Sequence, residues 1–176
     1  MLETKKSWSQ YFQPTQPISP NATKVNNLAV INYKLCRNGR ECKDVVHPKT
    51  GLTMFIDQLV QNYPDGVILI AHNGAKFDFP RLKRNLDRFD VKLKTNYTIH
   101  CIDSLPLFRQ NFPNLEAHNQ PVLVRRFLNA SKVPNEHDAL VDCMNLKKII
   151  KAAARQKKED ISAFLDHPRR PLTTFN

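Results

Sequence analysis

Two aspartates and a histidine have the types and positions that metal-dependent chemistry needs. Asp78 follows the apolar run Val67–Ala71 by a short loop, and Asp142 lies near the start of a long helical pattern, with His137 shortly before it. Carboxylate oxygens are the ligands that hard divalent cations such as Mg²⁺ prefer. Two such ions a few ångströms apart can stabilise the attacking and leaving oxygens of a phosphodiester while a histidine takes a proton from water. The set is therefore suited to phosphodiester hydrolysis.

Each of these residues also has an ordinary structural explanation. Asp78 stands before a Phe-Pro pair, where aspartate commonly caps a helix. Asp142 could be a solvated residue on a helix surface, and a lone histidine such as His137 is more often structural or exposed than catalytic. Taken one at a time, the residues favour these explanations, so the functional hypothesis depends on their combination. Asp103, which follows a strand of its own, is assigned to capping the next helix.

The elements around these residues alternate between strands and helices. The continuous apolar run Val67–Ala71 is typical of a strand buried on both faces, and residues 97–102 form a second strand pattern. Apolar spacing, with Pro or Asp at the helix starts, predicts helices at residues 52–63, 80–89, 105–108, 122–128 and 138–158. This alternation predicts an α/β sheet with its ligand chemistry at the carboxyl ends of the strands.

The two ends of the chain have weaker patterns. Residues 7–13 alternate in a way that favours a strand, residues 21–27 favour a loop or short helix, and Asn38-Gly39 favours a hairpin turn. The last residues contain several prolines and are expected to be loose. The predicted organisation is one domain over residues 7–158 with flexible ends. Those flexible ends are residues 1–6 and 166–176.

Composition narrows the class of partner. The 176 residues include 27 Lys and Arg against 16 Asp and Glu, which gives a formal net charge of +11. This length suits one domain with a sizeable core. The basic excess favours a polyanion, usually nucleic acid, although surplus lysine can also serve solubility alone. No apolar run approaches a membrane span, so no membrane partner is expected. The four cysteines lack metal-site spacing and, without a secretory signal, are interpreted as reduced thiols of an intracellular protein.

The combined motifs resemble those of a nuclease family. Residues 72–78, His-Asn-Gly-Ala-Lys-Phe-Asp, are similar to the second motif of the DEDDh 3′–5′ exonucleases, a branch of the ribonuclease H-like superfamily. Residues 137–142 resemble the third motif, His-x₄-Asp, and residues 102–105 resemble the strand-to-helix step between the two. The resemblance covers nearly all of residues 7–152. It is strongest to the exonuclease-like domains related to the C-terminal region of the promyelocytic leukaemia protein, which favours a nuclear location.

This resemblance implies a ribonuclease H-like α/β fold, with a mixed sheet flanked by helices. It implies that Asp78 and Asp142 are ligands of Mg²⁺ or Mn²⁺ in a two-metal site, and that His137 is the general base. The substrates it implies are the 3′ ends of single-stranded DNA or RNA, with the strand backbone held by residues 81–94 or 147–158. The residues expected to contact nucleic acid near the second motif are His72, Asn73, Arg81, Lys83 and Arg84.

The first motif of that family, Asp-x-Glu on its first strand, is not found. The start of the chain, Met-Leu-Glu-Thr, matches only the second half, and the segment between Glu3 and Ile18 is too short for the strands that should follow. We therefore interpret residues 6–13 as the third strand of a fold that lacks one or more N-terminal strands. With part of the ligand set missing, weak or absent activity is expected.

Two functional hypotheses stay open at this point. The first is a 3′–5′ exonuclease domain that is impaired in this chain. The second is a catalytically inactive pseudo-exonuclease that binds nucleic acid or a protein partner, and a decayed fragment without function is a third possibility. The sequence does not separate DNA from RNA, and it predicts neither a protein partner nor an oligomeric state.

Overall fold

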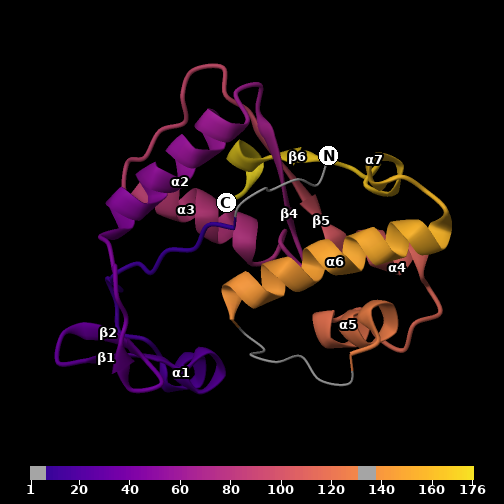
Figure 1. Cartoon of the computed structure of the whole chain (residues 1–176). Coiled ribbons are helices and arrows are strands. Elements are labelled where there is room, and N and C mark those ends of the chain that lie inside the picture. Colours follow the sequence, from indigo (N-terminus) through magenta and orange to yellow (C-terminus); the bar gives the residue numbers. More distant parts are fainter. Residues whose placement is uncertain (1–6, 131–137) are drawn as a thin grey trace. The chain divides into compact units, whose positions relative to one another are not determined.

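The computed structural model describes residues 7–130 and 138–176 (Figure 1). The chain divides into two compact units, whereas the sequence analysis treats residues 7–158 as one domain. The first, called the sheet unit, contains residues 66–84 and 98–176. The second, called the hairpin unit, contains residues 7–65 and 85–97. Both predicted aspartates belong to the sheet unit. Among the described residues, no helix combines the length and apolar composition that a membrane crossing requires.

The sheet unit is built on a three-stranded mixed sheet. Strand β4 (Val67–Ala71) pairs in parallel with β5 (Ile99–Asp103), and β6 (Arg170–Pro171) pairs antiparallel with β5. β5 is the central strand of the three, and the Val and Ile side chains of β4 and β5 suit pleated strand segments. In the β4–β5 register Ala71 lies opposite Asp103, so both carboxyl ends reach the same edge of the sheet. This α/β arrangement is the predicted fold class.

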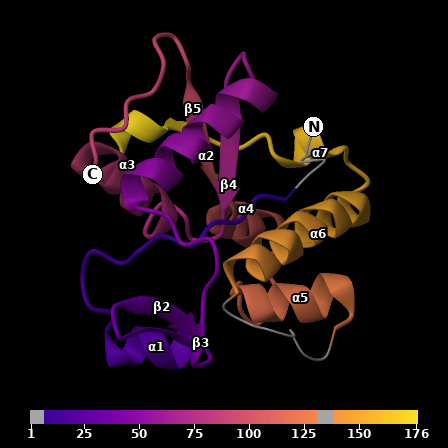
Figure 2. The same ribbon diagram turned by 60° about the vertical axis from the view of Figure 1, so that its left-hand side comes forward.

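Helices complete the sheet unit, and their starts follow local capping chemistry. They are α3 (Asp78–Arg88, with residues from 85 onward in the hairpin unit), α4 (Ser104–Asn111), α5 (Gln120–Leu128), α6 (Ala139–Lys157) and α7 (Ile161–Phe164). Asp103, Asn119 and Asp138 each accept a backbone N–H at the start of α4, α5 and α6. The predicted cap at Asp103 is confirmed. Figures 1 and 2 show α5 beside α6.

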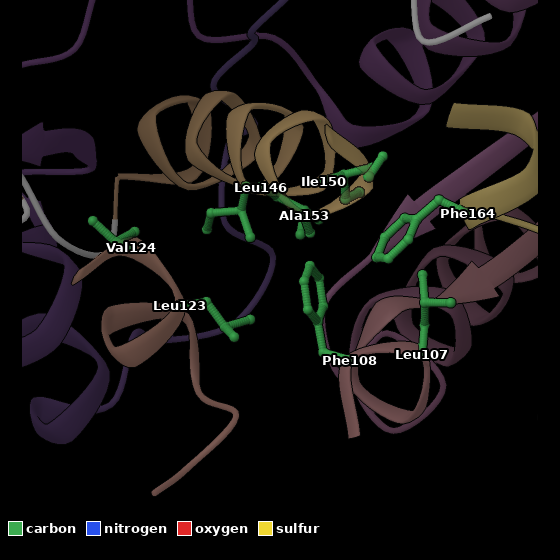
Figure 3. Close-up of a cluster of buried hydrophobic side chains, with 10 residues drawn as sticks. Leu107, Phe108, Leu123, Val124, Leu146, Ile150, Ala153 and Phe164 are labelled. Atoms are coloured by element: carbon green, nitrogen blue, oxygen red, sulfur yellow. The ribbon is translucent and has the colours of Figure 1, made fainter. Parts of the chain in front are cut away.

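Apolar side chains of α4 to α7 form the core of the sheet unit. Figure 3 shows Phe108 of α4 pointing toward α6, with Phe164 of α7 nearby. The two rings are 5.9 Å apart between centroids, and Phe108 is completely buried. The residues at the centre of this cluster are Leu107, Phe108, Leu123, Val124, Leu146, Ile149, Ile150, Ala153, Ala154 and Phe164. This core fixes α6, and therefore the start of the helix that carries Asp142.

Residues 166–176, expected to be a loose end, instead carry β6 and a single turn of 3₁₀ helix, η1 (Leu172–Thr174). Leu172 is 1% exposed and Phe175 is 5% exposed. The ring of Phe175 lies 5.3 Å from that of Phe79, between centroids. Proline here fixes an extended backbone beside β5, and the two apolar side chains attach it to the sheet unit. Both effects are long-range, so the local sequence did not predict them.

The hairpin unit consists of a small antiparallel sheet and two helices. Its elements are α1 (Pro20–Asn26), β1 (Leu28–Ile31), β2 (Lys34–Arg37), β3 (Arg40–Glu41) and α2 (Pro48–Asn62). The turn at Asn38-Gly39 joins β2 to β3 with positive φ at both residues, as the pattern predicts. The strand predicted at residues 7–13 is wrong, because that segment makes only an isolated bridge between Phe12 and Val46.

Candidate active site

The loop that leads from β4 to Asp78 packs tightly against the end of β4. Asn73 takes a left-handed conformation with φ of 59°, and Gly74 follows it with its carbonyl accepting the N–H of Phe79 at 3.0 Å. A Cβ atom on Gly74 would lie 2.6 Å from Cβ of Ala71 and 2.7 Å from the Phe79 ring. Any side chain at position 74 would therefore displace the turn. This packing explains why an Asn-Gly pair precedes Asp78, the first residue of α3.

Asp103 ties the same loop to the neighbouring strand. Its Oδ1 accepts the N–H of Leu105 at 2.9 Å, which is the predicted helix cap. Its Oδ2 accepts the N–H of Ala75 at 3.1 Å, in the loop before Asp78. One carboxylate therefore fixes both the start of α4 and the path of the loop after β4. The second of these contacts is a positioning role that the sequence analysis did not assign.

His72, predicted to contact nucleic acid, uses both ring nitrogens inside the chain. Nε2 lies 2.7 Å from the carbonyl oxygen of His118, and Nδ1 lies 3.0 Å from Oγ of Ser104, which is completely buried. A carbonyl only accepts hydrogen bonds, so Nε2 carries the hydrogen and Nδ1 accepts from the serine hydroxyl. Burial lowers the pKa of His72, against the opposing effects of the His118 carbonyl and the Asp103 charge. His72 thus acts here as a neutral structural link.

Asp78 and Asp142 are presented from the first turns of two helices. Asp78 is exposed, and partial desolvation, helped by the charge of Asp103, raises the pKa of its carboxyl group, while its own backbone N–H and Arg81 oppose the shift. Asp142 is half-buried one turn into α6, behind the cap made by Asp138. Its carbonyl accepts the side-chain amide of Gln120 at 2.6 Å, which joins α6 to α5.

Asp78 and Asp142 both act electrostatically on one thiol, that of Cys143. Cys143 is exposed, but partial desolvation raises the pKa of its thiol, and the charges of Asp78 and of Asp142 both raise it further. Both carboxylates therefore lie within electrostatic reach of the same sulfur atom, although Asp78 and Asp142 are far apart in the sequence. Cys143 was not singled out from the sequence, where only its place next to Asp142 would have pointed to it.

The donor chemistry of this pair fits a hard divalent cation in part. Carboxylate oxygens suit Mg²⁺ and Mn²⁺, and Asp78 and Asp142 can supply them. Over residues 7–130 and 138–176, however, no three His, Cys, Asp or Glu side chains converge into a ligand group. His137 and Glu3 lie outside the described residues. In the described part of the chain, the carboxylates available to a metal ion in this region are therefore those of Asp78 and Asp142, without a third converging side chain.

The remaining side chains predicted to contact nucleic acid near the second motif differ in their partners and exposure. Arg81 acts on the charge of Asp78, and its guanidinium carbon lies 5.7 Å from the centre of the Phe77 ring. Arg84 instead donates from Nε to the carbonyl of Pro80 at 3.3 Å, within its own helix. Lys83 is half-buried, and so is Asn73 in the turn. Of this set, Arg81 has the position best suited to a phosphate beside Asp78.

This α/β fold, with Asp78 after β4 and Asp142 in the first turn of α6, is consistent with a DEDDh-type nuclease domain. The chain belongs to the RNase_T family, described as exonuclease, whose model matches residues 1–150. The membership of an exonuclease family expected from the sequence is thereby confirmed. The greater likeness to domains related to the promyelocytic leukaemia protein stays a prediction.

Individual relatives are distant and longer. Exonuclease DPD1, chloroplastic/mitochondrial, of Arabidopsis thaliana is 25% identical over 152 residues, which is 82% of this chain and 46% of the relative. The DNA polymerase III subunit epsilon of Buchnera aphidicola is 29% identical over 146 residues, 83% of this chain and 55% of the relative. The chain thus spans about half the length of these curated relatives.

Proposed function

We propose that this chain is a 3′–5′ exonuclease domain that removes terminal nucleotides from single-stranded DNA or RNA with divalent metal ions. The observation that carries the proposal is the placement of the two aspartates: Asp78 begins α3 after β4 and Asp142 lies in the first turn of α6, in the same compact unit, and both act electrostatically on Cys143. Because the chain belongs to an exonuclease family, metal binding is the use that we propose for these two carboxylates. The net charge of +11 suits a polyanionic substrate.

Each residue of the site has a separate task in this proposal. Asp78 and Asp142 hold Mg²⁺ or Mn²⁺, and a pair of bound ions would stabilise the attacking and leaving oxygens of the phosphodiester. His137 is the proposed general base for the attacking water. Asp103 keeps the Asp78 loop in place through the N–H of Ala75, and His72 locks the adjoining backbone. Neither of these two needs to touch the substrate.

A pseudo-exonuclease that binds nucleic acid without cutting is the second candidate. It is favoured by a specific observation: the described residues bring together fewer than three metal-ligand side chains. Removing members of a catalytic unit costs orders of magnitude in rate. We accordingly propose that the chain's activity is low compared with a nuclease that has a complete set of carboxylates.

A degradation assay with a matched control tests the proposal. Purified chain is incubated with 5′-labelled single-stranded DNA or RNA and with Mg²⁺ or Mn²⁺, beside the variants Asp142→Asn and Asp57→Asn. Asp57 is an exposed carboxylate on α2 in the hairpin unit, so its variant controls for the loss of one negative charge. We expect stepwise shortening from the 3′ end that falls by about 100-fold or more in Asp142→Asn only.

The other outcomes contradict the proposal in different ways. Binding that is sensitive to salt, without shortening in either metal, would establish the pseudo-exonuclease. Shortening that Asp142→Asn leaves unchanged would show that the activity does not come from this site.

A further inference from the structure

We propose that the outer face of α6 is a second binding surface for the phosphate backbone of single-stranded nucleic acid, separate from the paired aspartates. This inference rests on the proposed function, because it takes nucleic acid as the ligand. The surface, called the α6 stripe, consists of Lys148, Lys151 and Arg155. It would hold a part of the strand that is not being cut.

The charge of α6 is strongly one-sided after its first turn. From Cys143 to the C-cap residue Lys158, the helix contains no Asp or Glu. Its cations in that span are Lys147, Lys148, Lys151, Arg155, Lys157 and Lys158. Cations in the last turn of a helix favour its dipole and need no ligand to explain them. Lys148 and Lys151 lie in the middle of α6, where the dipole gives no such benefit.

The helical spacing gathers the stripe on one face. Residues three and four positions apart are neighbours on a helix surface, and this spacing joins Lys148 to Lys151 and Lys151 to Arg155. Lys148 and Arg155 are exposed and Lys151 is half-buried. The completely buried residues Ile149 and Ala153 lie on the other side of the helix, against the core. At a rise of 1.5 Å per residue the stripe is about 10 Å long, which spans about three phosphates of a stacked strand.

These three cations keep their charge available for a ligand. Within the described residues, carboxylates pair instead with other cations, as in Lys34–Glu41, Lys92–Asp90 and Arg125–Glu116. No described carboxylate lies within ion-pair distance of the stripe. Cations without internal partners release condensed counterions when they meet phosphates, and this release drives binding to nucleic acid.

The stripe and the catalytic aspartate occupy different sides of α6. Asp142 precedes Leu146 by four positions and Ile149 by seven, so its Cα lies on the face that packs against the core. Phosphates on the stripe are therefore not the phosphate that is cut. Loss of the stripe should weaken binding and raise KM, while kcat for a bound 3′ end stays unchanged.

Two triple variants with equal loss of charge test the inference. The stripe variant is Lys148→Gln, Lys151→Gln and Arg155→Gln. The control variant is Lys34→Gln, Arg40→Gln and Arg125→Gln, which removes three exposed cations outside residues 81–94 and 147–158. Two of them, Lys34 and Arg125, have a carboxylate partner. Glutamine preserves helix propensity well at the helical positions. Binding of a 5′-fluorescein-labelled 20-nucleotide single strand is measured by anisotropy, with EDTA present, over a range of salt concentrations.

The stripe variant should bind roughly tenfold more weakly at low salt, and its slope of log K against log salt should shrink by about 2, or about 0.7 for each lost phosphate contact. The control variant should bind nearly as the original chain does. Equal losses in both variants, or no loss in the stripe variant, would overturn the inference.

A charge-preserving variant, Lys148→Arg with Lys151→Arg, controls for effects of substitution on folding. It should bind like the original chain. Weakened binding of this variant would also count against the stripe. Because no metal is present, the result does not depend on cleavage. Failure of the proposed function would appear separately, as absence of shortening in the degradation assay.

Discussion

His72 shows how a residue beside the site can serve it without touching substrate. Its ring links the end of β4 to the buried hydroxyl of Ser104 and to the backbone at His118. Protonation would place a second N–H donor on a ring whose two partners already have a settled donor and acceptor. The neutral ring is therefore part of what holds the loop between β4 and Asp78.

This link should make stability depend on pH. The folded pKa of His72 is lowered from its ordinary value of about 6.5, mainly by burial, while the His118 carbonyl and the Asp103 charge oppose the shift. Below pH 6.5, His72 binds protons more readily in the unfolded chain than in the folded chain. The stability that the neutral His72 contributes is therefore complete above pH 6.5 and is lost as the pH falls toward the folded pKa.

Urea unfolding of the chain and of His72→Asn, from pH 7.5 to 5, measures this dependence. We expect the variant to be less stable at pH 7.5, and the difference between the two to narrow as the pH falls. His167→Asn, which removes another histidine of the sheet unit, is the control. A difference that stays constant from pH 7.5 to 5 would contradict the assignment of His72 as a neutral link.

What the sequence could predict at this scale depended on distance along the chain. The cap by Asp103 was predictable because its acceptor and donor are two residues apart. Its bond to Ala75 spans 28 residues, and the bond from His72 to His118 spans 46, so neither has a local pattern. For the same reason the sequence alone does not show that both ring nitrogens of His72 have partners within the fold.

At the scale of elements, helices with clear caps were predicted best. The strand predicted at Val67–Ala71 is β4 and has the same bounds. The helix predicted at 138–158 is α6, which is one residue shorter at each end. The sequence did not predict β1 and β6, because neither has a clear local pattern. The pair β1 and β2 closes through Asn32-Tyr33, where both residues have positive φ without glycine at either position, so the usual hairpin pattern is absent. β6 has only two residues and no alternation of its own.

The importance of the C-terminal segment can be measured directly. Leu172→Ala removes a side chain that is 1% exposed, and we expect the free energy of unfolding to fall by about 2–5 kcal/mol. Thr173→Ala, an exposed position in the same turn, should change it by about 0.5 kcal/mol or less. Urea unfolding at pH 7.5 compares the two. Equal effects would show that the segment is not packed as described.

At the scale of the whole molecule, protection from solvent should be uneven. The core of the sheet unit contains completely buried side chains from four helices, α4 to α7. In the hairpin unit, β1 and its turn expose Val30 by 41%, Ile31 by 45% and Tyr33 by 95%. Elements with few buried apolar contacts open locally at low free energy.

Hydrogen exchange followed by mass spectrometry tests this contrast. We expect amides of β5 and of the buried half of α6 to exchange slowest, and amides of residues 28–37 to exchange fastest among the hydrogen-bonded segments. Rates are compared with those of the unfolded chain to remove the intrinsic effect of sequence. Equal protection of β1 and β5 would contradict the expected distribution of stability.

The position of β6 has a consequence for synthesis of the chain on the ribosome. β6 pairs with β5 through Cys101 and Arg170, so α4 to α7 must all be translated before this edge of β5 is covered. Pairings between such distant segments are slow to form, and an uncovered strand edge invites pairing with other chains. Translation products that stop before Arg170 should therefore be the ones that aggregate or require a chaperone, even though they contain both aspartates.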